Sequence, residues 1–283
     1  MRKTLILAIS LVFTLGITNA ATKKAKSTIV LATSQGFQGP EWEKHEYTVD
    51  KDGYIVLFDG TSLNGWRGYG KNHVPERWVI EDGCLHFIGN NNPAALDKNG
   101  KQKKDRGELV FGHKFKNCII GIEWKISKGG NSGIFYMAQE TTNPNGKLLP
   151  IYYSCPEYQV LDNENHPDAK LGKDNNRKSA SLYDMIPAKP QNAKPYGEWN
   201  KAKIVINNGK VTHYQNGVEV LSYNLWTPEW TQLLQGCKFS EKSIPEAFNL
   251  LNNCGGKNHE GLIGLQDHND DVWYRNIRVK VLK

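Results

Sequence analysis

Several features common in other classes of protein are missing from this sequence. Basic residues are scattered, and no clustered stripe of the kind that binds nucleic acid is present, although the formal net charge is +7. Methionine is scarce: three residues stand against 29 Phe, Trp and Tyr, a ratio that suits β-surfaces better than helix bundles. No CxxC or CxxH spacing indicates a structural zinc site. What is present, 39% hydrophobic and 10% aromatic residues in 283, excludes a disordered chain.

Residues 1–20 have the architecture of a secretory signal peptide: two cations, a short apolar stretch and small residues ending at Ala20. The apolar stretch is too short to span a bilayer comfortably, so a permanent membrane anchor is the less favoured alternative. We therefore expect a secreted or periplasmic protein without a stable membrane span once the signal is removed. Removal of Arg2 and Lys3 lowers the net charge from +7 to +5.

Five cysteines remain for an oxidising compartment, and an odd number leaves at least one thiol free. Cys237 and Cys254 lie in the same polar, irregular region, which makes them the best candidates for a disulfide. The others, Cys84, Cys118 and Cys155, fall in strand-like runs, where cysteine is usually a small buried hydrophobe.

The chain pattern predicts an all-β protein. Residues 21–50 are polar with little periodicity, and we expect an extended leader there. From residue 51 to residue 283, short strand-like runs recur between Gly, Asn, Asp and Pro clusters. In 118–126, apolar and polar residues alternate with a period of two, as in a strand with one face in a core. The exception is 225–258, where two short helix-like segments, with Thr227 and Ser243 as candidate caps, indicate a helical insertion. We predict a two-sheet sandwich carrying that insertion.

Two of the predicted strands carry a pair of polar side chains on one face and apolar side chains on the other. In 155–161, Glu157 and Gln159 alternate with apolar neighbours, and in 261–268 Gln266 and His268 do the same. A carboxylate, two amides and an imidazole on one sheet face would suit acid–base chemistry on a hydroxylated ligand. The alternative is an ordinary solvated sheet face.

Asp162 has two candidate roles. Strict alternation places it on the core face, where an unpaired carboxylate is costly, whereas a bulge or strand end would bring it round to Glu157. The spacing Glu157-x-Gln159-x-x-Asp162 resembles the acidic signature of laminarinase-type retaining glucanases, except that the middle acid is replaced by an amide. Asp162 is therefore either a catalytic carboxylate or a loop cap.

Four further residues are candidates for substrate contact. Asn131 begins a strand after a glycine turn and either caps that turn or contacts ligand. Arg275 heads an otherwise apolar strand face and needs a carboxylate, which Glu123 or Glu157 can supply. Tyr183 can stack on a sugar ring or pack in the core.

Five motifs, in order along the chain, resemble those of the 3-keto-disaccharide hydrolase domain family: FDGTSLNGW, GIEWKISKGGNSGIFY, EYQVLDN, GEWNKAKIVINNGKVTHYQNG and GLIGLQDHNDDVWYRNIRV. The resemblance extends from about Tyr54 to the C-terminus. It implies a concanavalin-A-like sandwich of the jelly-roll type, secretion, and cleavage of glycosides oxidised at sugar carbon 3.

The implied reaction is elimination followed by hydration. A ketone at carbon 3 acidifies the proton at carbon 2, so a base can form an enolate that expels the aglycone from carbon 1. Such chemistry needs a base, for which Glu157 and His268 are the candidates, and donors for the developing negative charge. The candidate donors are Gln159, Gln266 and Arg275, or a divalent metal ion held by Glu157 and His268. We expect the insertion at 225–258 to border the site; the alternative functions are a glycan-binding module and a conventional glycosidase.

Overall fold

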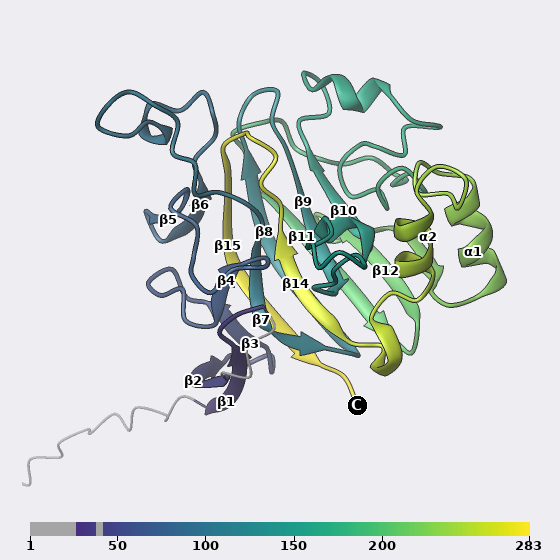
Figure 1. Cartoon of the computed structure of the whole chain (residues 1–283), viewed down its shortest axis with the longest axis horizontal. Coiled ribbons are helices and arrows are strands. Elements are labelled where there is room, and N and C mark those ends of the chain that lie inside the picture. Colours follow the sequence, from purple (N-terminus) through teal and green to yellow (C-terminus); the bar gives the residue numbers. More distant parts are fainter. Residues whose placement is uncertain (1–26, 38–41) are drawn as a thin grey trace, which may run out of the picture.

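The computed structural model describes residues 27–37 and 42–283, so the predicted signal peptide at 1–20 lies outside the described residues. Within this range the chain forms strands in two layers (Figure 1). The strands are β1 (Ser27–Ser34), β2 (Trp42–Val49), β3 (Ile55–Phe58), β4 (Trp66–Gly68), β5 (Trp78–Glu81), β6 (Cys84–Phe87), β7 (Leu109–Phe115), β8 (Cys118–Ile126), β9 (Asn131–Ala138), β10 (Glu157–Leu161), β11 (Asn200–Asn207), β12 (Lys210–Gln215), β13 (Val218–Asn224), β14 (Gly261–Leu265) and β15 (Val272–Val281).

The two layers are antiparallel sheets, which confirms the predicted sandwich. The larger follows the order β1-β2-β3-β15-β8-β11-β12-β13, with the β5–β6 hairpin joined to β15. The smaller follows the order β10-β9-β14-β7-β4. Its inner face meets the larger sheet, and its outer face carries the site described below.

Local sequence explains most of these strands. In β8 the alternation gives a strictly alternating burial pattern, with Ile120, Ile122 and Trp124 facing the core. The hairpins β11–β12 and β12–β13 turn at Asn208-Gly209 and Asn216-Gly217, where both residues of each pair have positive φ. Asn and Gly adopt this conformation at little cost, and such turns match the twist of the flanking strands.

The segment predicted as a leader contributes instead to the larger sheet. β1 and β2 pair along their whole length, and Val49 of β2 pairs with Ile55 of β3. Inside this polar hairpin Leu31, Thr33 and Tyr47 are buried, and the Tyr47 ring contacts Phe111 edge-on at 5.5 Å. The alternation of apolar and polar residues is weak in this part of the sequence because only these few side chains face the core.

The core between the sheets is rich in aromatic residues. Trp124 from the larger sheet and Tyr158 from the smaller are both essentially inaccessible. The Tyr158 hydroxyl donates to the backbone oxygen of Tyr214 at 3.3 Å, so the phenol joins the two layers. This packing fixes the facing of β10 and therefore turns its alternate residues outward.

The insertion contains helices α1 (Pro228–Gln235) and α2 (Pro245–Asn252), which lie together at one side of the sandwich (Figure 1). Thr227 caps α1 by accepting from the backbone N–H of Trp230, as predicted. Ser243 does not cap α2, because Ile244 occupies the cap position. The Trp230 indole donates to the backbone oxygen of Leu251, which holds the helices together.

The predicted disulfide between Cys237 and Cys254 is wrong, since all five cysteines are free. Cys254 is buried in the core cluster, whereas the Cys237 thiol donates to the backbone oxygen of Leu234 at the end of α1. Burial raises the pKa of both thiols, which makes them inert rather than reactive. In residues 27–37 and 42–283 we find no helix of the length and apolarity needed to cross a membrane.

Candidate active site

A pocket of about 190 Å³ lies on the outer face of the smaller sheet. It contains six of the residues singled out from the sequence and two that were not, and its lining is Asn131, Tyr152, Glu157, Gln159, Tyr183, Lys238, Gln266 and His268. Glu157 and His268 thus open into one hollow although they lie more than 100 residues apart in the chain.

Strand register brings the polar side chains together. β9 lies between β10 and β14, and Gly133 of β9 pairs with Gln159 and accepts the backbone N–H of Gln266 at 3.0 Å. Gly264 of β14 and Glu157 of β10 both pair with Phe135. Gly133 therefore lies between Gln159 and Gln266, and because it has no side chain it leaves room for the polar side chains of the neighbouring strands.

Glu157 depends on the glycine beside it. A Cβ added at Gly133 would lie 2.8 Å from the Glu157 side-chain Cδ and closer still to its oxygen Oε1. The carboxyl is only 7% exposed, and burial raises its pKa from 4.5 to about 8. With the Gln159 amide turned to the orientation that satisfies both of its ends, its nitrogen donates to the backbone oxygen of Ser132 at 3.0 Å and to Glu157 Oε1 at 3.3 Å.

Neighbouring charges shift the pKa of Glu157 in opposite directions. Lys238 lowers its pKa, whereas Asp168 and Glu108 raise it, and desolvation exceeds all three. Since the pKa lies near neutrality, both protonation states of this carboxyl are populated under ordinary conditions. A group of this kind can both accept and donate a proton.

Lys238 enters the pocket from the segment between α1 and α2. Burial lowers the pKa of its ammonium group, although Glu157 and Asp184 oppose that shift. Its Nζ lies 4.2 Å from the ring centre of Tyr183 and, among the residues described, forms no ion pair with a carboxylate. The predicted helical insertion therefore does border the site.

A chain of polar contacts holds this segment over the sheet. The Tyr183 hydroxyl donates to Asp168, Asp168 pairs with Arg177 at 2.9 Å, and Arg177 pairs with Asp184 at 2.6 Å. Asp184 accepts the backbone N–H of Lys238 at 2.9 Å. Hydrogen bonding thus fixes Tyr183 at the side of the pocket. Through Asp184, the loop 162–184 also positions Lys238.

Near His268, three potential metal ligands come together at the edge of the pocket. Ligand atoms of His166, His268 and Asp270 all lie within 4.8 Å of one another. Burial lowers the pKa of His166 and raises that of Asp270. Glu157 does not belong to this cluster, so the structure brings His166 and Asp270 to His268, and the predicted metal pair of Glu157 and His268 stays a prediction.

Arg275 and Glu123 do not belong to the pocket. They pair with each other on the larger sheet, Arg275 Nε to Glu123 Oε2 at 2.9 Å, and line a separate hollow of about 640 Å³. The prediction that Glu123 could pair with Arg275 is confirmed. The prediction that Arg275 shares the apolar face of Ile277 and Val279 is wrong, because a register shift between Arg275 and Arg278 turns Arg275 to the other face of β15. Because Arg278 in that hollow also pairs with Asp50, both guanidinium groups there are neutralised.

Asp162 is a loop cap. Its carboxylate accepts the backbone N–H of Gly129 and the Asn165 amide, each at 2.7 Å, and these bonds together with that from Glu164 hold its pKa below the usual value. The side chain follows the end of β10 and ties two loops together, outside the pocket lining. The catalytic alternative for this residue is therefore wrong.

Four site residues escaped the sequence analysis: Tyr152, His166, Lys238 and Asp270. All lie outside regular strands, so periodicity gave no signal for them. The string QDHNDD, which contains Asp270, offered a hint, because acids and a histidine crowd after a glycine-rich strand. Lys238 had no local signal at all.

Structural comparison places this sandwich among solved proteins of Parabacteroides distasonis provisionally named glycosyl hydrolases. One has a TM-score of 0.63 at 26% identity and covers 82% of this chain and 95% of its own. A second, at 20% identity, has a TM-score of 0.56 with 81% and 99% covered, and supports the fold alone. Together with the family and the relative described next, the fold defines the class: a carbohydrate-active, glycoside-cleaving enzyme.

A match to a protein family places the chain more narrowly within this class of enzymes. The sequence model of the 3-keto-alpha-glucoside-1,2-lyase-like domain matches residues 53–280, and the chain belongs to that family. A protein of Bacteroides thetaiotaomicron named 3-keto-disaccharide hydrolase is 59% identical over 268 residues, covering 93% of this chain and 90% of the relative.

Gly133→Ala tests the pocket floor. The added methyl group would displace the Glu157 carboxyl, and a misplacement of about 1 Å can reduce activity by about 100-fold. We expect such a loss in kcat/KM for glycoside cleavage. Gly121→Ala in β8 is the matched control, since its Cβ would meet only the Arg278 side chain at 3.4 Å. Equal activity in both variants would contradict the arrangement.

Glu157→Gln tests the burial of the carboxyl. The pKa of Glu157 is raised in the folded state. The free energy of unfolding of the protein with Glu157 therefore falls relative to that of Glu157→Gln as the pH rises from 4.5 to about 8, by up to about 1.4 kcal/mol per pH unit. We expect a Tm difference in favour of Glu157→Gln that grows between pH 5 and pH 8.5. Thermal unfolding without divalent cations measures it, and a difference independent of pH would show that the carboxyl is solvated.

Proposed function

We propose that this protein is an extracytoplasmic enzyme that cleaves 3-keto-glycosides, among them 3-keto-disaccharides, by elimination and hydration. The observation that carries the proposal is a single buried carboxyl with a pKa raised to about 8 in a pocket without a second carboxylate in its lining. Family membership and the name of the Bacteroides relative support the same substrate class. Extracytoplasmic location rests on the pattern of residues 1–20.

The lining of the pocket argues against a conventional glycosidase. Retaining and inverting glycosidases place two carboxyl groups on either side of the scissile bond. Here Asp162 caps a loop, and Asp168 is engaged by Arg177 and Tyr183, so that among the described residues Glu157 is the one carboxyl in the pocket lining. Elimination from a ketone needs no nucleophilic carboxylate, so it is compatible with one acid.

In the proposed reaction, the Glu157 carboxylate removes the proton at sugar carbon 2, and the electrons form an enolate with the oxygen at carbon 3. The enolate then expels the glycosidic oxygen from carbon 1. A base with a pKa near the working pH is well suited to the first step. Gln159 and Gln266 line the same pocket and can orient the sugar hydroxyl groups through their amides.

Lys238 is the candidate acid. Its ammonium group faces the same hollow and carries a proton that burial makes easier to release. Transfer of this proton to the leaving oxygen produces the free alcohol and leaves a neutral amine. Water then adds across carbons 1 and 2: the amine takes one proton of the water, and protonated Glu157 returns its proton to carbon 2, so both groups are restored.

The substrate assignment is tested by comparing a 3-keto-glucoside and the unoxidised glucoside, each with a chromogenic aglycone. We expect release from the ketone only, and a loss of about 1,000-fold or more in kcat for Glu157→Gln, because the base is removed. Glu123→Gln, whose carboxylate is paired outside the pocket, is the matched control. Release from the plain glucoside would support a glycosidase, and binding without release would support a glycan-binding module.

The role of Lys238 is tested by varying the leaving group. An alkoxide needs a proton as it leaves, whereas a nitrophenolate does not. We expect Lys238→Met to lose about 100-fold in kcat on alkyl 3-keto-glucosides and less than about fivefold on the nitrophenyl compound.

Lys203→Met is the matched control, since its Nζ lies over the Tyr214 ring, away from the pocket. An equal loss on both substrates would assign Lys238 a purely structural role.

A further inference from the structure

Beyond Glu157 and Lys238, the pocket has a second chemical centre at its rim. His166 comes from the loop that follows β10, at the start of a 3-10 helix (Pro167–Lys170), and His268 and Asp270 come from the connection between β14 and β15. Their ligand atoms lie within 4.8 Å of one another. No hydrogen bond or ion pair links these three side chains in the part of the chain that the structure describes, and the two imidazoles meet only edge-on, with ring centres 6.1 Å apart.

A second observation also indicates a missing ligand. Asn131 is 3% exposed, and its amide oxygen Oδ1 has no hydrogen-bond partner. Its amide nitrogen lies 3.5 Å from Nε2 of His268, so the amide is next to the cluster, and a turn of the amide would present the oxygen to it. The buried oxygen of Gln266 in the same pocket also lacks a donor. Buried oxygens without donors are costly, and a cation supplies what they lack.

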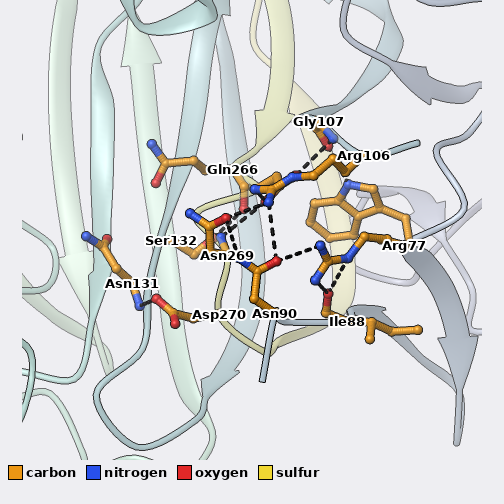
Figure 2. A network of polar contacts seen from close by, with 12 residues as sticks. Arg77, Ile88, Asn90, Arg106, Gly107, Asn131, Ser132, Gln266, Asn269 and Asp270 are labelled. Atoms are coloured by element: carbon orange, nitrogen blue, oxygen red, sulfur yellow. Dashed lines mark hydrogen bonds and ion pairs between the residues drawn. The ribbon is translucent and has the colours of Figure 1, made fainter. Parts of the chain in front are cut away.

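The connection between β14 and β15 is fixed from outside. Asp267 binds the Arg106 guanidinium through both oxygens and accepts the backbone N–H of Gly107 at 2.9 Å. Figure 2 shows Arg106 reaching Asn269 and Asn90, with Asp270 bonded to the backbone N–H of Asn131. These contacts position the loop that carries His268 and Asp270, as outer contacts do in metal sites, and the Asp270 carboxylate keeps Oδ1 available for an ion.

We propose that His166, His268 and Asp270 bind one divalent first-row transition metal ion, with the Asn131 oxygen as a further ligand. Two imidazoles and one carboxylate suit zinc, manganese, iron or cobalt, whereas calcium and magnesium prefer oxygen ligands alone. The ion would lie beside the pocket with positions open to substrate. This inference rests on the proposed function for its role, which is to bind the oxygen at carbon 3 and stabilise the enolate.

Two local adjustments accompany binding. A tetrahedral ion with bonds near 2.1 Å brings its ligand atoms to about 3.4 Å, so the three side chains must close by roughly 1 Å. His166 Nδ1 accepts the backbone N–H of Asp168 at 3.1 Å, which leaves the ring proton on Nε2. Coordination through Nε2 moves that proton to Nδ1 and breaks the contact, a small loss beside the affinity of such sites.

Metal binding to the whole chain is measured directly, without an activity assay. Protein stripped with a chelator is titrated with Zn²⁺ by calorimetry and with Co²⁺ by visible absorption, which reports the ligand geometry. We expect one equivalent bound, and a loss of affinity of about 100-fold or more for His166→Ala and for Asp270→Asn. Asp270→Asn keeps an acceptor for the Asn131 N–H, and thermal unfolding checks that both variants fold.

The matched control is His73→Ala, since His73 pairs with Asp105 on the surface away from the pocket. Absence of tight binding in the stripped protein, or equal loss in all three variants, would overturn the metal site. Cleavage of the 3-keto-glucoside by fully stripped protein would overturn its role while leaving the proposed function intact. Tight binding without any cleavage would leave the metal site standing and remove the proposed function.

Discussion

The site depends on the burial of one carboxyl group without a cation in direct contact. Loss of water, more than any neighbouring charge, sets the pKa of Glu157. A sheet face can enclose such a group only if the next strand leaves room for it and another layer excludes solvent. Gly133 provides the room, and the loop 162–184 with the segment around Lys238 provides the cover.

The cover explains why a small sheet can carry a reaction site. The chain of contacts from Tyr183 through Asp168, Arg177 and Asp184 fixes the height of Lys238 above the strands. Burial favours the uncharged form of both Glu157 and Lys238, and in the proposed reaction each of them exchanges a proton with the substrate.

Sequence periodicity predicted the strands well and the partners of their side chains poorly. Alternation turned Glu157, Gln159 and Gln266 outward from the core, and the structure has them lining one pocket. The same alternation put Arg275 on an apolar face, and it could not show that a register shift in β15 turns this side chain outward on the other sheet. His166, Asp270 and Lys238 lie in irregular segments, whose positions follow from long-range contacts that no local pattern records.

The sequence by itself determined the class of the fold, the facing of residues within each strand, the turns at Asn-Gly pairs and the family. These follow from local geometry, because a strand alternates with a period of two and a tight turn needs residues that tolerate positive φ. Tertiary structure alone decided that Asp162 caps a loop, that Cys237 and Cys254 stay apart, and that two histidines and Asp270 meet beside the pocket. Such meetings depend on which strands become neighbours and on how the loops cover them, and both are set by packing across the whole core.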